Sequence, residues 1–137
     1  DESGLRVYGG GVAEPKFKIS KSAKRKDKKP ITVHTGPKIV IAMDGTSGSM
    51  RVVRDAEFCS NHHAAVLYPT DLKVDLDWFV QANESYLRAL SVNQQGSGTL
   101  SMPALESFNV AVPKDESLQE KIGNARRALL NLQARFA

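Results

Sequence analysis

Short apolar runs separated by glycine, proline and polar residues fill the first half of the chain. Residues 4–8 (GLRVY) and 31–35 (ITVHT) have strand-like patterns, and residues 38–43 (KIVIAM) form the continuous apolar run of a buried strand. Residues 50–54 (MRVVR) follow a short turn and are expected to pair with that run, and residues 63–69 (HAAVLYP) give a further strand. The pattern therefore predicts a strand-rich first half.

Helical periodicity appears in the second half. In residues 75–90 (DLDWFVQANESYLRAL), apolar side chains recur every three or four positions, and Asp75 is placed to cap the first turn. Residues 102–107 (MPALES) are expected to form one further helical turn. Residues 108–113 (FNVAVP) alternate as in a strand, which Pro113 ends.

The last segment, from Asp115 onward, is the most regular. Its apolar residues are spaced alternately by four and three positions, which is typical of the narrow seam of a coiled coil. The seam consists of Leu118, Ile122, Ala125, Leu129, Leu132 and Phe136. Two interpretations stay open: the helix packs on its own domain, or it pairs with a partner helix.

Composition agrees with one compact α+β domain, rich in strands, with a mid-chain helix and a long C-terminal helix. The chain has 137 residues, of which 41% are hydrophobic and 25% charged. Cys59 is its only cysteine, so an intramolecular disulfide is excluded and a reducing compartment is favoured. We find neither a long apolar run nor a signal-like start, and we expect a soluble cytoplasmic protein, cut from a longer polypeptide because no initiator Met is present.

Positive charge is concentrated in residues 16–29 (KFKISKSAKRKDKK). The chain has 19 basic and 15 acidic residues, and this segment holds 8 of the basic ones against Asp27 alone. The eight are Lys16, Lys18, Lys21, Lys24, Arg25, Lys26, Lys28 and Lys29. Two interpretations of such a run stay open: it is a solvated, mobile loop, or it is an arm that binds a polyanion. Phe17 and Ile19 alternate with lysines at its start, which is the pattern of an edge strand.

The sequence gives only weak indications of a phosphate-binding, metal-binding or catalytic site. The stretch 44–51 (DGTSGSMR) has no lysine at the position that a phosphate-binding loop requires, and a strand follows it, so a tight turn is expected. Zinc binding by Cys59, His62 and His63 is disfavoured because adjacent histidines in a strand point to opposite faces. Catalysis by Cys59 lacks a residue that would orient a base, and His34 is interpreted as an ordinary surface or core histidine.

The order of several short motifs resembles the target recognition domain of type I restriction–modification specificity subunits, which also occurs in fused restriction-methyltransferases. In that family a strand leads into a glycine loop, a Gly-(Thr/Ser)-x-Gly hairpin follows, and a Ser-Asn element precedes a strand. A Gly/Ser loop then leads to a strand ending in proline, and a Gln-x-x-Ile sequence opens the final helix. The matching positions are Gly9, Gly10, Gly11, Gly45, Thr46, Gly48, Ser60, Asn61, Gly96, Ser97, Gly98, Pro113, Gln119 and Ile122.

The resemblance implies a DNA target recognition domain over residues 1–114 and a coiled-coil-like helix over residues 115–137. Such a unit binds double-stranded DNA, has no catalytic activity, and directs an adenine methyltransferase and restriction subunits or fused domains to their site. S-adenosylmethionine would be bound by the methyltransferase, with no cofactor in this chain and no membrane contact. The terminal helix would pair with its counterpart or form a homodimer. Besides the eight basic residues of the segment, the expected DNA contacts are Arg51, Arg54, Asn61 and His62.

Two other functions stay open at this point. The first is a protein-interaction module that oligomerises through its last helix and has no role on DNA. The second is a small hydrolase, for which Asp44, His62 and His63 are the only candidates.

Overall fold

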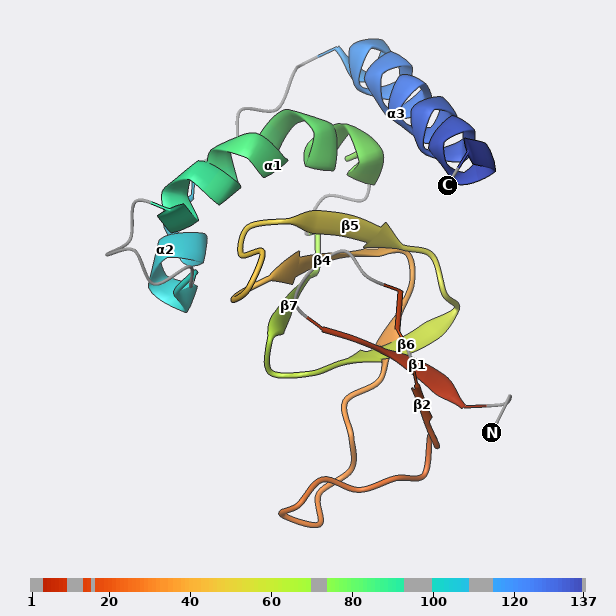
Figure 1. Ribbon diagram of the computed structural model, residues 1–137, viewed down its shortest axis with the longest axis vertical. Coiled ribbons are helices and arrows are strands. Elements are labelled where there is room, and N and C mark those ends of the chain that lie inside the picture. Colours follow the sequence, from red (N-terminus) through yellow and green to blue (C-terminus); the bar gives the residue numbers. More distant parts are fainter. Residues whose placement is uncertain are drawn as a thin grey trace.

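The computed structural model describes residues 4–9, 14–15, 17–69, 74–92, 100–108 and 115–136. It has the expected α+β fold, with strands first and helices afterwards (Figure 1). The strands are β1 (Leu5–Tyr8), β2 (Lys18–Ile19), β3 (His34–Thr35), β4 (Lys38–Ala42), β5 (Met50–Val53), β6 (Glu57–Ser60) and β7 (Ala64–Leu67). The helices are α1 (Leu76–Val92), α2 (Met102–Glu106) and α3 (Glu116–Phe136).

The described strands form two sheets. One has the order β2-β1-β6-β3, in which β1 pairs in parallel with β6 and the other pairs are antiparallel. The other has the order β5-β4-β7 and is antiparallel throughout. In the second sheet Ile41 faces Met50 and Lys38 faces Val53, which confirms the predicted pairing of β4 with β5.

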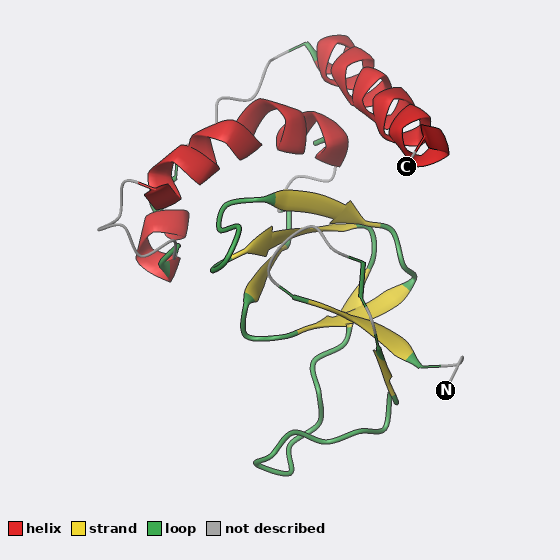
Figure 2. Ribbon diagram, in the orientation of Figure 1, coloured by secondary structure: helices red, strands yellow, loops and turns green. Residues whose placement is uncertain are grey.

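Strand β4 is apolar over most of its length because both of its faces are covered. Ile39 and Ile41 face a core shared with α1, where they join Val80 and Leu87. Val40 points to the opposite face, into a second core with Tyr8, Val53 and Phe58. Figure 2 shows α1 lying across the three-stranded sheet, with the four-stranded sheet on the side away from α1.

The helix starts follow ordinary capping chemistry. The Asp75 Oδ1 atom accepts a hydrogen bond from the Trp78 backbone N–H at 3.0 Å, as expected of an N-cap. The Ser101 hydroxyl accepts one from the Ala104 N–H at 3.2 Å and starts α2, the predicted single turn. Helix α3 packs beside α1 (Figure 1).

Several expectations need correction or lie outside the described residues. The sequence pattern does not predict strand β6, because its short sequence EFCS has two polar ends and no alternation over four residues. The strand expected at 31–35 is reduced to β3, and β2 confirms an edge strand at Lys18–Ile19. The predictions for Gly10, Gly11, Lys16, the 96–98 loop, the strand after Phe108, Pro113 and the Phe136 side chain lie outside what the structure describes.

In the part of the chain that the structure describes, no helix is both long and apolar enough to cross a membrane.

Candidate nucleic-acid interface

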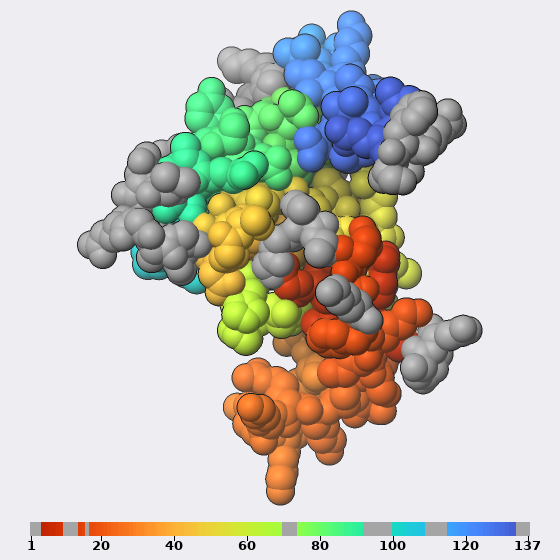
Figure 3. Space-filling model, viewed as in Figure 1, coloured from red at the N-terminus to blue at the C-terminus, as the bar shows by residue number. Residues whose placement is uncertain are grey.

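The basic segment forms an arm that projects from the body at the end opposite α3. We call residues 20–33 the basic arm; it is the orange loop of Figures 1 and 3. Its tip is a closed turn, because the Arg25 N–H donates to the Lys29 carbonyl at 2.8 Å and the Lys28 N–H donates to the Arg25 carbonyl at 2.9 Å. Lys28 has a φ of 65°, and Asp27 accepts the Lys29 N–H at 3.1 Å. The tip is therefore a hydrogen-bonded hairpin.

Cations cover the outside of this arm. Lys21 pairs with Glu57 at 2.8 Å, and Arg25 lies 3.5 Å from the Asp27 carboxylate. The exposed cations on the arm and the adjoining strand β2 are Lys18, Lys21, Lys24, Arg25, Lys26, Lys28 and Lys29. Because so many like charges gather on one projection, the arm carries a positive field that attracts a polyanion.

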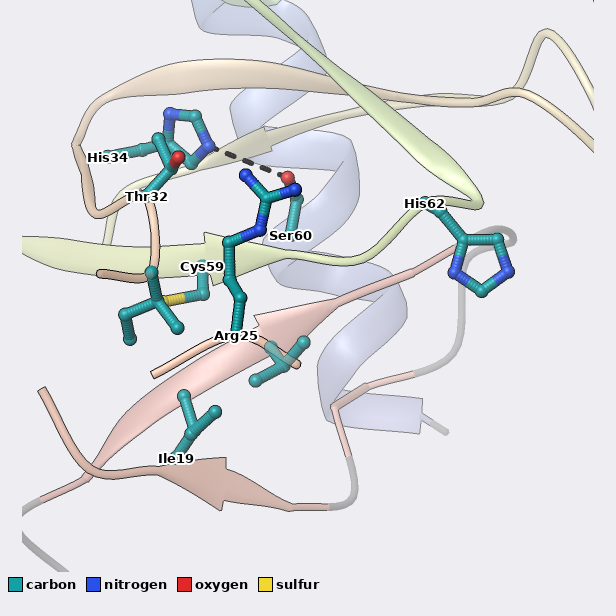
Figure 4. A pocket seen from close by; sticks show the side chains of 9 residues that line it. Ile19, Arg25, Thr32, His34, Cys59, Ser60 and His62 are labelled. Carbon is teal, nitrogen blue, oxygen red and sulfur yellow. Dashed lines mark hydrogen bonds between the residues drawn. The ribbon is translucent and has the colours of Figure 1, made fainter. Parts of the chain in front are cut away.

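A cavity of about 450 Å³ lies between the arm and the four-stranded sheet (Figure 4). Its lining residues are Val7, Ile19, Arg25, Ile31, Thr32, His34, Cys59, Ser60 and His62. Figure 4 shows the Arg25 side chain turned into this cavity, beside Ser60. The structure thus brings together two predicted site residues, Arg25 and His62, and adds the polar side chains of Thr32, His34 and Ser60. The sequence gives no sign that these last three line one site, because only the topology makes them neighbours.

Among the cavity's polar groups, His34 is held neutral. Burial lowers the pKa of its imidazole, and the nearby Lys38 ammonium lowers it further. Its Nδ1 atom contacts the Tyr68 hydroxyl, and its Nε2 atom lies 3.5 Å from the Ser60 Oγ atom. At neutral pH, His34 therefore offers a neutral hydrogen-bonding ring and adds no positive charge to the cavity.

The turn between β6 and β7 holds the Ser-Asn element. The Asn61 N–H donates to the Tyr8 carbonyl at 2.9 Å, and its Oδ1 atom accepts the His63 N–H at 2.9 Å. A Cβ at Gly9 would lie 2.7 Å from the Asn61 amide nitrogen. Asn61 therefore fixes this turn against the end of β1, and a DNA contact by its side chain stays a prediction. His62 is exposed beside it.

Arg51 and Arg54 lie in a different place. They line a separate groove of about 320 Å³ with Asp77, Glu84 and Arg126. The Arg51 Nη2 atom is 2.7 Å from a Glu14 oxygen, and its guanidinium stacks over the Tyr8 ring at 5.0 Å. The Arg54 guanidinium pairs with the buried carboxylate of Asp77. The structure thus gives both arginines partners within the protein and does not bring them to the arm, and their role on DNA stays a prediction.

Beneath Arg51 lies a further polar cluster that sequence reasoning did not find. The Arg6 Nε atom donates to Asp55 Oδ2 at 2.8 Å, and the Tyr8 hydroxyl lies 3.0 Å from the same oxygen. The Arg6 hydrogen bond, more than that of Tyr8, holds the pKa of Asp55 below its ordinary value. Burial, with the Asp55 hydrogen bond, raises the pKa of Tyr8 to about 12. The cluster ties β1 to the β5–β6 connection.

The glycine turn between β4 and β5 packs on α1. Gly45 and Gly48 have φ values of 70° and 87°, as a tight turn requires. The Ser47 hydroxyl is buried against that of Ser91 in α1, and the Met50 N–H donates to Glu84 at 2.8 Å. Because the Ser47 hydroxyl is buried against α1 and is not open to a ligand, the structure supports the predicted tight turn over a phosphate-binding loop.

The candidate groups for metal binding or hydrolysis are not assembled into a centre. His63 and Asp44 form a pair at 2.8 Å, with side chains that are 45% and 42% exposed. Cys59 is buried, and burial raises the pKa of its thiol, which disfavours the nucleophilic thiolate. Among the described residues, no three His, Cys, Asp or Glu side chains are grouped so that they could hold a metal ion.

The sequence matches no protein-family model and no curated protein. The structure, however, is similar to solved S subunits of type I restriction–modification systems. The S subunit from M. genitalium gives a TM-score of 0.71 at 18% identity, with 96% of this chain and 33% of that chain covered. HsdS from Thermoanaerobacter tengcongensis gives 0.64 at 19% identity, with 98% and 32% covered.

A third similar chain comes from a structure that describes the assembly and conformational transition of the type I R-M system. It gives a TM-score of 0.66 at 20% identity, with 97% of this chain and 32% of that chain covered. The chain therefore spans about a third of the length of these proteins, and it has the fold of that part of a type I restriction–modification S subunit.

Proposed function

We propose that this domain recognises double-stranded DNA for a restriction–modification system. The single observation that carries the proposal is the basic arm, whose exposed lysines and arginine project from one end of the body. Neutralisation of DNA phosphates by such cations releases counterions and favours binding. The fold shared with type I S subunits supports the same role.

In this proposal the arm and the cavity beside it have different tasks. The lysines of the arm contact the phosphate backbone and set the position of the domain on the duplex. Arg25 and His62 belong to the side-chain types that contact DNA directly, and they lie at the cavity between arm and sheet. Asn61 holds the turn that presents His62.

The catalytic steps then belong elsewhere. An adenine methyltransferase and a restriction endonuclease, as partner subunits or fused domains, would carry out the chemistry at the site that this domain selects. S-adenosylmethionine would be bound by the methyltransferase and not by this chain.

A gel-shift titration with a pool of random duplex oligonucleotides, at two salt concentrations, tests the proposal. We expect binding that weakens steeply with salt, and selection from the pool should enrich one sequence. Salt-dependent binding with no enriched sequence would contradict sequence recognition. Failure to bind DNA at low salt would contradict any role on DNA.

One observation favours the second candidate, an interaction module without DNA. Leu118, Leu129 and Leu132 of α3 are 44%, 51% and 50% exposed. Such a stripe is a surface for a partner helix, whether or not the domain binds DNA. An enriched DNA sequence in the selection would decide against this candidate as the whole function.

A further inference from the structure

Helix α3 is attached to α1 through a polar face. Gln119, Gly123 and Arg127 recur every four residues and therefore lie on one side of the helix. All three converge on Asp75, the N-cap of α1. The Asp75 N–H donates to Gln119 Oε1 at 3.3 Å, and both terminal nitrogens of Arg127 lie 3.3 Å from the Asp75 carboxylate.

Gly123 allows this close approach. A Cβ at this position would overlap the Asp75 carboxylate, and Gly123 is itself buried in the contact. Gln119, at 4% exposed, is buried one turn before it. The backbone of α3 therefore lies directly on the start of α1, at a distance that a larger side chain would increase.

Asp77 connects this contact to the sheet. Its Oδ2 atom accepts a hydrogen bond from Arg127 at 2.5 Å and also pairs with Arg54, which follows β5. Asp77 is only 1% exposed, so its charge depends on these two arginines. The two aspartates in turn raise the pKa of Arg127, Asp75 more than Asp77. One arginine of α3 is thus tied to α1 directly and to β5 through Asp77.

Several leucines of α3 are left outside this contact. An ordinary amphipathic helix packs its apolar face on its own domain, whereas Leu129 and Leu132 of α3 are about half exposed. Hydrogen bonds and ion pairs are directional, so a polar contact restricts the angle of a helix more than an apolar one does.

We infer that Asp75 and Asp77, with Gly123 and Arg127, are positioning residues that fix the direction of α3 relative to the sheets. The domain thereby presents the leucine seam at a set angle before any partner helix arrives. The significance of this angle rests on the proposed function, because a rigid α3 would hold the DNA-binding body at a fixed orientation relative to a partner helix on the seam. The rigidity itself can be measured without DNA.

Spin labels at Thr35→Cys and Gln133→Cys, in the full chain with Cys59→Ala, report the distance between the body and the end of α3. Labelled protein is diluted with unlabelled protein, so that only distances within one molecule contribute. We expect a single narrow distance distribution for the otherwise unmodified chain. Arg127→Gln should widen it at least twofold, and Arg127→Lys, which keeps the charge, should restore part of the order.

Lys121→Gln is the matched control. Lys121 is a cation of the same helix at an exposed position, and it takes no part in the contact with Asp75 and Asp77. Its replacement should leave the distribution narrow. Equal widening in both variants, or none in Arg127→Gln, would overturn the inference.

Gly123→Ala provides a second route if Arg127→Gln fails to fold. It leaves every charge in place and should shift the mean distance, because the added methyl group meets the Asp75 carboxylate. An unchanged mean distance in a folded Gly123→Ala variant would contradict the inference. Failure to bind DNA in the gel-shift assay would contradict the proposed function, but it would leave the measured distances and the positioning role of these residues intact.

Discussion

Gly48 lies backbone to backbone against Arg88 of α1. A Cβ added to Gly48 would be 2.7 Å from the Arg88 Cα atom, closer than such carbon atoms approach in folded proteins. Gly45, three residues earlier in the same turn, has no atom within 4 Å of its hypothetical Cβ. The two glycines therefore meet different requirements: Gly45 supplies only a positive φ, and Gly48 supplies a positive φ and a close contact.

Replacing each glycine by alanine should separate the cost of a positive φ from the cost of the close contact with α1. Gly45→Ala is expected to lower the free energy of unfolding by about 1 kcal/mol, the cost of a side chain at positive φ. Gly48→Ala is expected to cost more, on the order of 2–4 kcal/mol, because α1 must also move from the sheet. Urea unfolding of both variants measures the difference. If both variants lose the same free energy of unfolding, α1 can move away from the turn at little cost, and the contact of Gly48 with Arg88 adds no requirement of its own.

The glycine turn also shows what could be predicted from the sequence. The spacing of Gly45 and Gly48 between two apolar runs is sufficient to predict a hairpin, because turn chemistry and strand pairing are local. The contact of Gly48 with Arg88 is between residues far apart in the chain and has no local signal. The lining of the cavity beside the basic arm could be predicted only in part for the same reason. The sequence predicts Arg25 as a site residue, but it does not predict Thr32 or Ser60, which only the fold brings there.

The basic arm should govern the salt dependence of DNA binding. We predict that the triple replacement Lys24→Gln, Arg25→Gln and Lys26→Gln weakens binding to all sequences. The slope of log affinity against log salt should fall by about 0.9 for each DNA phosphate that the variant no longer neutralises. Gel shifts at several salt concentrations give the slope.

A control for this prediction removes exposed cations elsewhere. Arg88 in α1 and Lys121 in α3 are exposed and belong to other elements. Their joint replacement by Gln changes the net charge without altering the arm. If this control reduces the slope as much per charge as the arm variant does, the effect comes from net charge, and the arm has no special part in binding.

The cluster around Asp55 should make stability depend on acid pH. Arg6 and Tyr8 hold the pKa of Asp55 below its ordinary value, so the folded state favours the ionised carboxylate. Its contribution is therefore present above the ordinary pKa of aspartate and is lost as the pH falls through the lower pKa of the folded state. Asp55→Asn should cost on the order of 2 kcal/mol at neutral pH, and much less once the pH is below the lowered pKa of Asp55 in the folded state.

Urea unfolding of both proteins as a function of pH tests this expectation. The two curves should converge as the pH falls, because the protonated carboxyl of the unmodified protein then resembles the amide. A difference that stays constant down to acid pH would show that the loss comes from packing and not from the charge of Asp55.

The terminal helix illustrates a partly correct prediction. The spacing predicts a narrow apolar seam, and its residues Leu118, Leu129 and Leu132 are exposed in the structure. The sequence does not show that α3 also docks on its own domain, because that contact uses Gln119, Gly123 and Arg127, which no hydrophobic pattern detects. The interpretation that α3 packs on its own domain is therefore confirmed. Pairing of its exposed leucines with a partner helix stays a prediction.

We predict that these exposed leucines make the domain a homodimer. Seam residues at alternate spacings of four and three suit a second copy of the same helix, and an exposed leucine stripe is unfavourable in water. Leu129→Asp with Leu132→Asp should make the protein monomeric without unfolding it, since both side chains are already half exposed. Sedimentation equilibrium measures the association, and circular dichroism checks the fold.

The matched control places the same charges beside the seam. Asn131→Asp with Gln133→Asp adds two carboxylates to exposed positions of α3 that lie off the apolar spacing. This variant should stay dimeric, because the leucines still meet across the interface while the new charges face solvent. If both double variants dissociate, charge repulsion between copies explains the effect without a leucine seam. If the unmodified domain is already monomeric at high micromolar concentration, α3 packs only on its own domain and the interpretation as a partner helix fails.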